Sequence, residues 1–225
     1  MSTIRAVLFD LDQTLLDRTT SLKRFLKWQV DFFQLVPKAE KEKFIQCFIE
    51  LDANGTVWKD VVYRQLIQKF KITQFNTQEL EQQLLSSYIQ DFNQFCVAFA
   101  GVETVIQTLS KAGYSLGLIS NGKTPFQEHN FQALGLSEYF SCVLVSEAVG
   151  LRKPQPEIFQ MACQQMNVIP EQCVMIGDNE IADLQGAKNI GMQTILFNAE
   201  QEIKLTQADD QVQCFGEMLS IILKI

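Results

Sequence analysis

The chain has 225 residues, of which 26 are acidic and 19 basic, so its formal net charge is −7. Hydrophobic residues make up 47% and charged residues 20%, which is ordinary globular usage and excludes a disordered or fibrous chain. The acidic excess makes nucleic acid and an anionic membrane surface poor partners, and no apolar run is long enough for a transmembrane helix. At about 150 residues per domain, the length fits one or two domains.

Cysteine and histidine usage also limits the class of protein. The six cysteines are scattered, none forms a CxxC pair, and only one histidine is present. We therefore expect reduced, buried thiols and no zinc site. The N-terminal residues meet acidic side chains at once and lack the apolar core of a signal peptide, so we expect a cytoplasmic protein. The sequence leaves the oligomeric state open.

The first predicted element is a short apolar strand over residues 4–9, which stops at Asp10. Residues 16–96 are helical in pattern, because apolar side chains recur there at steps of three and four residues. Turn signals at Pro37 and Asn54-Gly55 separate the helical segments. These segments cover residues 22–33, 41–51, 58–70 and 77–92.

From residue 97 onward, short apolar runs alternate with helical segments. Strands are predicted over residues 115–119, 142–145, 173–176 and 194–197. Helices are predicted over residues 102–112, 124–134, 156–166 and 181–190, and a short strand followed by a closing helix over 212–223. Strands separated by helices of this length predict βαβ units and a mostly parallel sheet.

One strand precedes the helical block and the others follow it. We therefore predict an α/β fold in which residues 1–15 and 97–225 form a Rossmann-like, mostly parallel sheet core. Residues 16–96 would be an α-helical domain inserted after the first strand.

Polar residues follow four of the predicted strands. Ligands of an open parallel sheet bind beyond the carboxyl ends of the strands, so we expect these side chains to converge. In chain order they are Asp10 and Asp12, Ser120 and Asn121, Lys153, and Asp178 with Asp183 one helical turn later.

The chemistry of this cluster indicates a phosphate site with a metal ion. Four neighbouring carboxylates repel one another, and Mg²⁺ with oxygen ligands resolves that repulsion. Ser120, Asn121 and Lys153 would supply donors and positive charge for a phosphate group. A carboxylate facing a phosphoryl group is placed for attack, and a second one two residues later can transfer protons.

Four segments carry a resemblance to a known family. DLDQT from residue 10, SNG from 120, KPQPEIF from 153 and GDNEIADLQGA from 177 resemble, in order and spacing, the motifs of the haloacid dehalogenase-like hydrolase superfamily. The helical block at residues 16–96 resembles the α-helical C1-type cap of that superfamily.

The resemblance implies a role for each matching residue. Asp10 matches the nucleophile that becomes an aspartyl-phosphate, and Asp12 matches the general acid/base. Thr14 matches the threonine that orders the nucleophile loop. Ser120 and Lys153 match the phosphate-binding serine and lysine. The family's Mg²⁺ would be held by the carboxylates of Asp10 and Asp178, by the backbone carbonyl of Asp12, and with support from Asp183.

These roles predict a Mg²⁺-dependent phosphatase of a small phosphorylated metabolite. A phosphomutase of sugar phosphates would use the same core and stays an alternative. Dehalogenating members resemble DxYGT instead of DxDxT, so Asp12 disfavours a haloacid dehalogenase. The intact motifs disfavour a non-catalytic phosphate-binding protein.

The helical block is expected to close over the site, with hinges near residues 16–20 and 96–100. Its most polar, turn-rich stretch lies between two predicted helices. Asp52, Asn54 and Lys59 in that stretch are candidate residues for substrate specificity.

Overall fold

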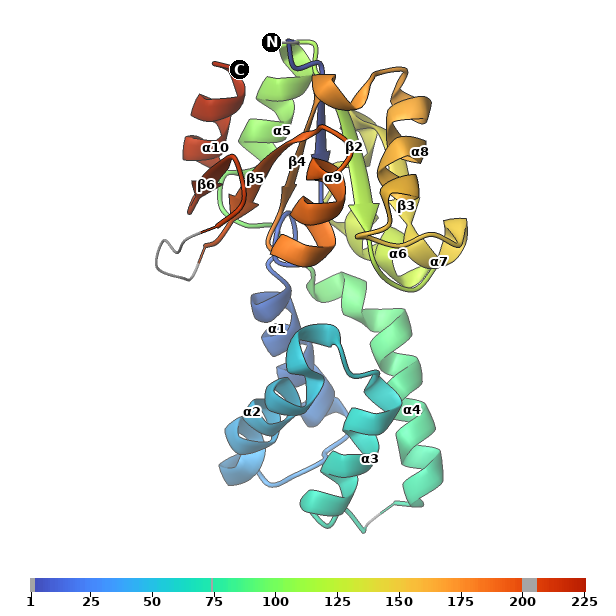
Figure 1. The fold of residues 1–225 in the computed structure, drawn as a ribbon. Coiled ribbons are helices and arrows are strands. Elements are labelled where there is room, and N and C mark those ends of the chain that lie inside the picture. Colours follow the sequence, from blue (N-terminus) through green and yellow to red (C-terminus); the bar gives the residue numbers. More distant parts are fainter. Residues whose placement is uncertain (1–2, 74, 200–205) are drawn as a thin grey trace. The chain divides into compact units, whose positions relative to one another are not determined.

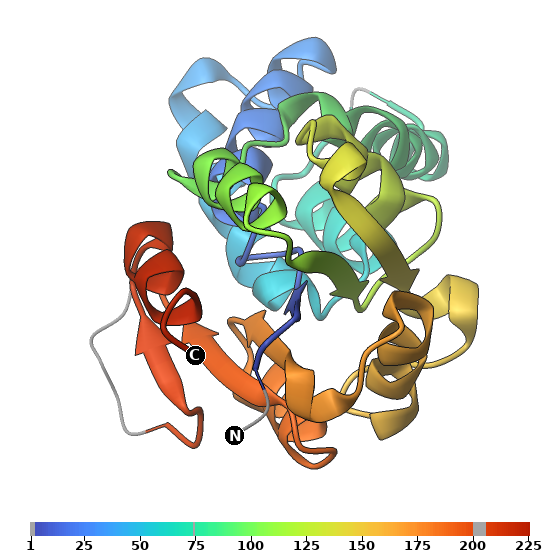
Figure 2. The ribbon, with the colours of Figure 1, turned by 90° about the horizontal axis from the view of Figure 1, so that it is seen from above.

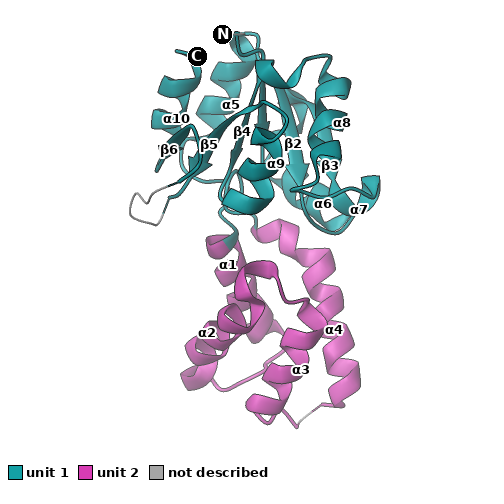
Figure 3. Cartoon of the chain, in the orientation of Figure 1, with its two compact units in different colours: residues 1–18, 96–225 teal, residues 19–95 magenta. Residues whose placement is uncertain are grey.

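The computed structural model describes residues 3–73, 75–199 and 206–225 (Figure 1). It divides into two compact units, which Figure 3 shows in different colours. Unit 1 comprises Met1–Arg18 and Cys96–Ile225, and unit 2 comprises Thr19–Phe95. Among the described residues, no helix combines the length and the apolar character that a membrane crossing requires.

Unit 1 is built on a six-stranded sheet in which every pair of neighbouring strands is parallel. The strand order is β3-β2-β1-β4-β5-β6. The strands are β1 (Ala6–Phe9), β2 (Ser115–Ser120), β3 (Phe140–Val145), β4 (Cys173–Gly177), β5 (Gln193–Phe197) and β6 (Asp210–Val212). The predicted parallel α/β fold is confirmed.

Strand β1 lies at the centre of this arrangement. The chain runs outward from β1 to β2 and β3, and then returns to pair β4 with the other side of β1. The strand order therefore reverses between β1 and β4, which is where open parallel sheets bind ligands. All four residues of β1 are fully buried, as expected for a strand covered on both faces.

Helices cover both faces of the sheet (Figure 2). α5 packs against α10 on one face, and α8 packs against α9 on the other. Gly117 in β2 permits the close packing under α8, because a Cβ there would lie 2.5 Å from a Leu8 methyl and 2.8 Å from the Met166 sulfur. The helices of unit 1 are α5 (Val102–Lys111), α6 (Phe126–Ala133), α7 (Ser146–Val149), α8 (Pro156–Met166), α9 (Gly186–Lys188) and α10 (Phe215–Ile222).

In its described residues, unit 2 is helical. α3 packs against both α2 and α4. Phe25 of α1 lies at the centre of an aromatic cluster, with ring centroids 5.5 Å from Tyr88 and 5.8 Å from Phe92. The helices are α1 (Arg18–Phe32), α2 (Lys41–Asp52), α3 (Lys59–Lys69) and α4 (Thr77–Asp91).

One element differs in kind from its prediction. The helix predicted over residues 181–190 is a π-helical turn, Glu180–Gln185, followed by the short helix α9. Asn179 caps this turn, since its Oδ1 accepts hydrogen bonds from the backbone N–H groups of Ile181 and Ala182, at 3.1 and 2.9 Å. π-Helical turns often occur at functional sites.

Candidate active site

The site lies beyond the carboxyl ends of β1, β2 and β4. Asp10 directly follows β1, Ser120 is the last residue of β2, and Asp178 directly follows β4. Because these strands are adjacent and in register, their following residues lie at one edge of the sheet. The Asp10 backbone N–H also donates to the carbonyl of Ile176 in β4 (2.9 Å), which ties the two strand ends together.

Three predicted metal ligands form an acidic cluster. Each of Asp10, Asp178 and Asp183 offers a carboxylate oxygen, and these oxygens all lie within 4.8 Å of one another. The side chains of Asp10 and Asp183 are buried, and Asp178 lies at the exposed rim. A donor set made only of carboxylate oxygens fits a hard divalent cation such as Mg²⁺.

The electrostatics of the cluster follow from this crowding. Burial, together with the charges of Asp183 and Asp178, raises the pKa of Asp10 well above its ordinary value. Although the Asp178 side chain is exposed at the rim, the protein atoms crowded around its carboxylate and the charge of Asp183 raise the pKa of Asp178 to about 7. Without positive charge nearby, the carboxylates would therefore resist being ionised together.

Lys153 supplies positive charge inside this cluster. Its Nζ lies 2.5 Å from Asp10 Oδ1 and 2.7 Å from Asp183 Oδ1, and it donates to the Ile119 carbonyl at 2.6 Å. Burial alone would lower the pKa of Lys153, but Asp10 and Asp183 raise it overall, so the ammonium form is retained. Lys153 thus offsets the repulsion between two of the acids.

Asn121 fixes the loop that carries Lys153. Its Nδ2 donates to the Lys153 carbonyl and its Oδ1 accepts from the Lys153 backbone N–H, both at 2.9 Å. This reciprocal pair engages the side-chain amide of Asn121, and the predicted part of Asn121 in phosphate binding stays a prediction. Asn121 therefore anchors the backbone of Lys153 to the end of β2.

Asp183 is held by the turn that follows β4. Its Oδ2 accepts a hydrogen bond from the Asn179 backbone N–H at 3.0 Å. Gly177 leaves space for this carboxylate, because a Cβ at that position would collide with the side chain of Asp183. The π-helical turn and Gly177 together bring Asp183 into the acidic cluster, although it lies five residues beyond Asp178.

Asp12 and Ser120 are linked through a residue that was not predicted. The Nε2 of Gln127 in α6 donates to Asp12 Oδ2 at 2.8 Å and to Ser120 Oγ at 2.9 Å. Both Gln127 and Ser120 are buried. The sequence carries no signal for this residue, because the buried face of α6 at residues 127, 130 and 131 is known only from the structure.

Thr14 is fully buried in the loop that follows Asp10. Its Oγ1 has no hydrogen-bond partner among the residues that the structure describes. The loop turns tightly, since the backbone N–H of Leu16 donates to the Leu11 carbonyl at 2.8 Å. Thr14 therefore lies within this turn, two residues after Asp12.

The three specificity candidates lie where α2 leads into α3 of unit 2: Asp52 ends α2, Asn54 lies in the turn, and Lys59 begins α3. Asp52 and Lys59 form a buried ion pair, and their side chains are 1% and 2% exposed. Asp52 also accepts from the Gly55 backbone N–H at 2.9 Å, and Lys59 donates to the Val57 carbonyl at 3.1 Å. Asn54 is exposed in the intervening turn with φ of 53°. Their part in specificity stays a prediction.

Comparisons with known proteins agree with the motifs. The sequence profile of the haloacid dehalogenase-like hydrolases matches residues 7–197. The chain is 27% identical to the glyceraldehyde 3-phosphate phosphatase of Pyrococcus furiosus, covering 94% of this chain and 90% of that protein. It is 29% identical to the pyrimidine 5'-nucleotidase PynA of Streptococcus pneumoniae, covering 93% and 90%.

A solved structure has the same fold over nearly the whole chain. The HAD-hydrolase YfnB of Bacillus subtilis, crystallised with bound magnesium, superposes with a TM-score of 0.73 at 20% identity. The match covers 98% of this chain and 99% of that one. With the profile match spanning most of the sequence, the chain belongs to the haloacid dehalogenase-like hydrolase family, as its four motifs predicted.

Proposed function

We propose that the protein is a Mg²⁺-dependent phosphatase that hydrolyses a small phosphorylated metabolite through an aspartyl-phosphate. The observation that carries this proposal is the position of Asp10. It stands at the end of the central strand, within the acidic cluster and in contact with the Lys153 ammonium. Two relatives that match more than nine-tenths of the chain, named as a glyceraldehyde 3-phosphate phosphatase and a pyrimidine 5'-nucleotidase, support a small phosphorylated substrate.

Asp10, Asp178 and Asp183 would hold the cation, with the backbone carbonyl of Asp12 as a further ligand. When bound, Mg²⁺ neutralises the carboxylates and stabilises negative charge on the phosphoryl oxygens. These residues suit Mg²⁺ because they offer only oxygen ligands, and because one carboxylate oxygen of each lies within 4.8 Å of the others.

In the first step, an Asp10 carboxylate oxygen attacks phosphorus, and the bond from phosphorus to the leaving oxygen breaks. Lys153 and the Ser120 hydroxyl bind the phosphoryl oxygens and keep them in line for this attack. Asp12 gives its proton to the leaving oxygen, so the product departs as a neutral alcohol.

In the second step, water attacks the phosphorus of the aspartyl-phosphate. Asp12, now a carboxylate, takes a proton from that water. Phosphate leaves, the Asp10 carboxylate is regenerated, and Asp12 is again protonated for the next cycle.

We further propose that residues 16–96 act as the cap domain that selects the substrate. The compactness of residues 19–95 as a separate unit supports this assignment. The turn with Asp52, Asn54 and Lys59 is the proposed specificity segment. A cytoplasmic location is proposed from the sequence.

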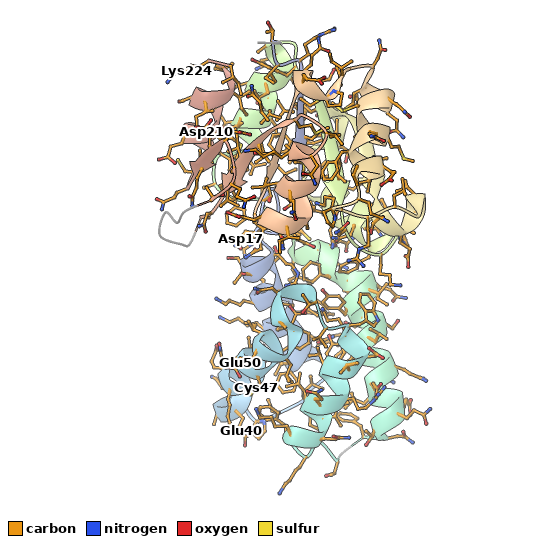
Figure 4. All side chains as sticks on the ribbon, viewed as in Figure 1. Asp17, Glu40, Cys47, Glu50, Asp210 and Lys224 are labelled. Atoms are coloured by element: carbon orange, nitrogen blue, oxygen red, sulfur yellow. The ribbon has the colours of Figure 1, made fainter. Side chains whose placement is uncertain are left out.

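The test is phosphate release by the purified protein with Mg²⁺ and a panel of phosphorylated metabolites. The panel includes glyceraldehyde 3-phosphate, pyrimidine nucleoside monophosphates, phosphoglycolate and hexose phosphates. We expect release by the wild-type protein and by Asp210→Asn, and none by Asp10→Asn. Asp210 is a suitable control because it is an exposed acid in β6 (Figure 4).

Equal release by Asp10→Asn and the wild type would contradict the assigned nucleophile. The mutase alternative predicts a different result with the hexose phosphates. Interconversion of isomeric hexose phosphates without net phosphate release would replace the hydrolase assignment.

A further inference from the structure

Gln127 connects two groups of the proposed mechanism, although it belongs to no motif. It lies in the first turns of α6, and its side chain is 3% exposed. One amide nitrogen donates to Asp12 Oδ2 at 2.8 Å and to Ser120 Oγ at 2.9 Å. An amide –NH₂ carries two hydrogens, so each acceptor can receive one of them.

A second amide contacts Gln127 from the other side. Asn130, one turn later in α6, donates from Nδ2 to Gln127 Oε1 at 3.3 Å. Asn130 is also buried. A flipped Gln127 would place its carbonyl oxygen against the Asp12 carboxylate and its –NH₂ against the Asn130 donor. The contact with the Asp12 carboxylate would then be repulsive, so this carboxylate sets the orientation of the Gln127 amide, and the Asn130 donor supports it.

This arrangement determines which atoms of Ser120 and Asp12 are available to the substrate. Because Ser120 Oγ accepts the hydrogen bond from Gln127, its own hydroxyl proton is available to a phosphoryl oxygen. Because Asp12 Oδ2 accepts from Gln127, its Oδ1 is the oxygen available for proton transfer. A hydrogen bond between a neutral amide and a carboxylate also orients that carboxylate without cancelling its charge.

We propose that Gln127 is a positioning residue that aims the Ser120 hydroxyl at the phosphoryl group and holds Asp12 for proton transfer at Oδ1. This inference rests on the proposed function. Loss of the amide would free the Asp12 carboxylate to rotate. It would therefore impair proton donation to the leaving oxygen more than any step that needs no proton.

The test measures kcat/KM for a series of aryl phosphates, from 4-nitrophenyl to 4-methoxyphenyl phosphate, whose phenols differ in acidity. kcat/KM reports the steps up to and including departure of the phenol. The less acidic the phenol, the more its departure depends on a proton from Asp12. For Gln127→Met, which keeps the approximate size but removes the donor, we expect a loss on the order of tenfold or more with 4-methoxyphenyl phosphate. The loss with 4-nitrophenyl phosphate should be clearly smaller.

Two further variants keep the test decisive. Gln132→Met places the same side chain at an exposed position of α6 and should match the wild type. Asn130→Leu leaves Gln127 in place but removes the donor to its carbonyl, and should show a smaller loss with the same dependence on the phenol. If Gln127→Met does not fold, Asn130→Leu carries the test alone.

The outcomes separate the inference from the proposed function. A wild-type protein that releases no phosphate from any substrate would overturn the proposed function and the inference with it. An active wild type, with variants that match it or lose activity equally for every phenol, would overturn the inference alone. A steeper dependence on phenol acidity in both Gln127→Met and Asn130→Leu would support it, since a merely structural role lowers all rates in proportion.

Discussion

Lys153 is the residue on which the charge balance of the site depends. It is buried between Asp10 and Asp183 and contacts both carboxylates. Removing one partner from a buried ionic group leaves the remaining charges uncompensated, which is more costly than losing an exposed ion pair. The charge of Lys153 is therefore expected to matter more than that of any exposed lysine in the protein.

The first prediction concerns this charge. Lys153→Met keeps the approximate length of the side chain but removes the ammonium group that contacts both Asp10 and Asp183. We expect kcat/KM for aryl phosphate hydrolysis to fall by about 10²- to 10³-fold. Lys188→Met is the matched control, because Lys188 pairs with Asp209 and its side chain is 44% exposed. Comparable activity of the two variants would contradict the role of Lys153.

Single residues were predictable where a chemical type and a strand end coincide. Asp10, Ser120 and Asp178 each follow a recognisable apolar strand, so their convergence follows from the parallel order. The contact between Lys153 and Asp10 spans 143 positions along the chain, and its geometry depends on the folded loop. Gln127 was not predicted, because a glutamine in an amphipathic helix has no chemical signature until its buried face is known.

At the scale of elements, the termini of strands and helices deliver the functional groups. The strands were predictable because strands that are buried on both faces of a parallel sheet appear in the sequence as short, continuous apolar runs. The π-helical turn Glu180–Gln185 was not, because it differs from an α-helix only in backbone hydrogen bonds that span five residues instead of four. The turn brings Asp183 into contact with Asn179 and Gly177, and these contacts, although local in the chain, leave no signal in the apolar periodicity.

Asp209 directly precedes β6 and contacts side chains or backbone of α9 and β5. It accepts from the Thr194 backbone N–H at 2.9 Å, from the Thr194 hydroxyl at 2.8 Å, and from Lys188 at 2.9 Å. Partial burial would raise the pKa of Asp209, but the donors of Lys188 and Thr194 lower it below its ordinary value of 3.8. Asp209 thus favours folding when it is ionised.

A second prediction follows for the pH dependence of stability. Because the pKa of Asp209 is lower in the folded state, its contribution is present above pH 3.8 and is lost as pH falls through the folded-state pKa. Urea unfolding at neutral pH should therefore show Asp209→Asn to be less stable than the wild type, and the gap should narrow in acid. Asp210→Asn, at the neighbouring exposed residue, should show little gap at either pH. A gap for Asp209→Asn that is constant with pH would contradict this account.

At the scale of the whole molecule, the chain divides into an α/β unit and a helical unit with separate cores. Residues 1–18 belong to the α/β unit although most of that unit lies after residue 95. This division has a physical basis in the sequence. A single N-terminal strand cannot form a sheet alone, and it pairs with β2 and β4 from the C-terminal part.

The third prediction is that the α/β unit is stabilised by its cation. A ligand that binds only the folded state stabilises it by about 2.7 kcal/mol at a concentration of 100 Kd. MgCl₂ should therefore raise the Tm of the metal-free wild-type protein and of Asp210→Asn, and should raise that of Asp178→Asn much less. Activity should disappear with EDTA and return with Mg²⁺. A wild-type Tm that does not respond to Mg²⁺, with activity unaffected by EDTA, would exclude the proposed metal site.

The central claim, that Asp10 forms a covalent phosphoryl intermediate, is tested most directly by mass spectrometry of acid-quenched turnover with 4-nitrophenyl phosphate. Its leaving group needs little proton donation, so Asp12→Asn should still be phosphorylated but should hydrolyse the intermediate slowly. We predict that the peptide containing Asp10 gains one phosphoryl group in Asp12→Asn and none in Asp10→Asn. Phosphate release by the wild type without phosphorylation of that peptide in Asp12→Asn, and with Asp10→Asn as active as the wild type, would contradict the account.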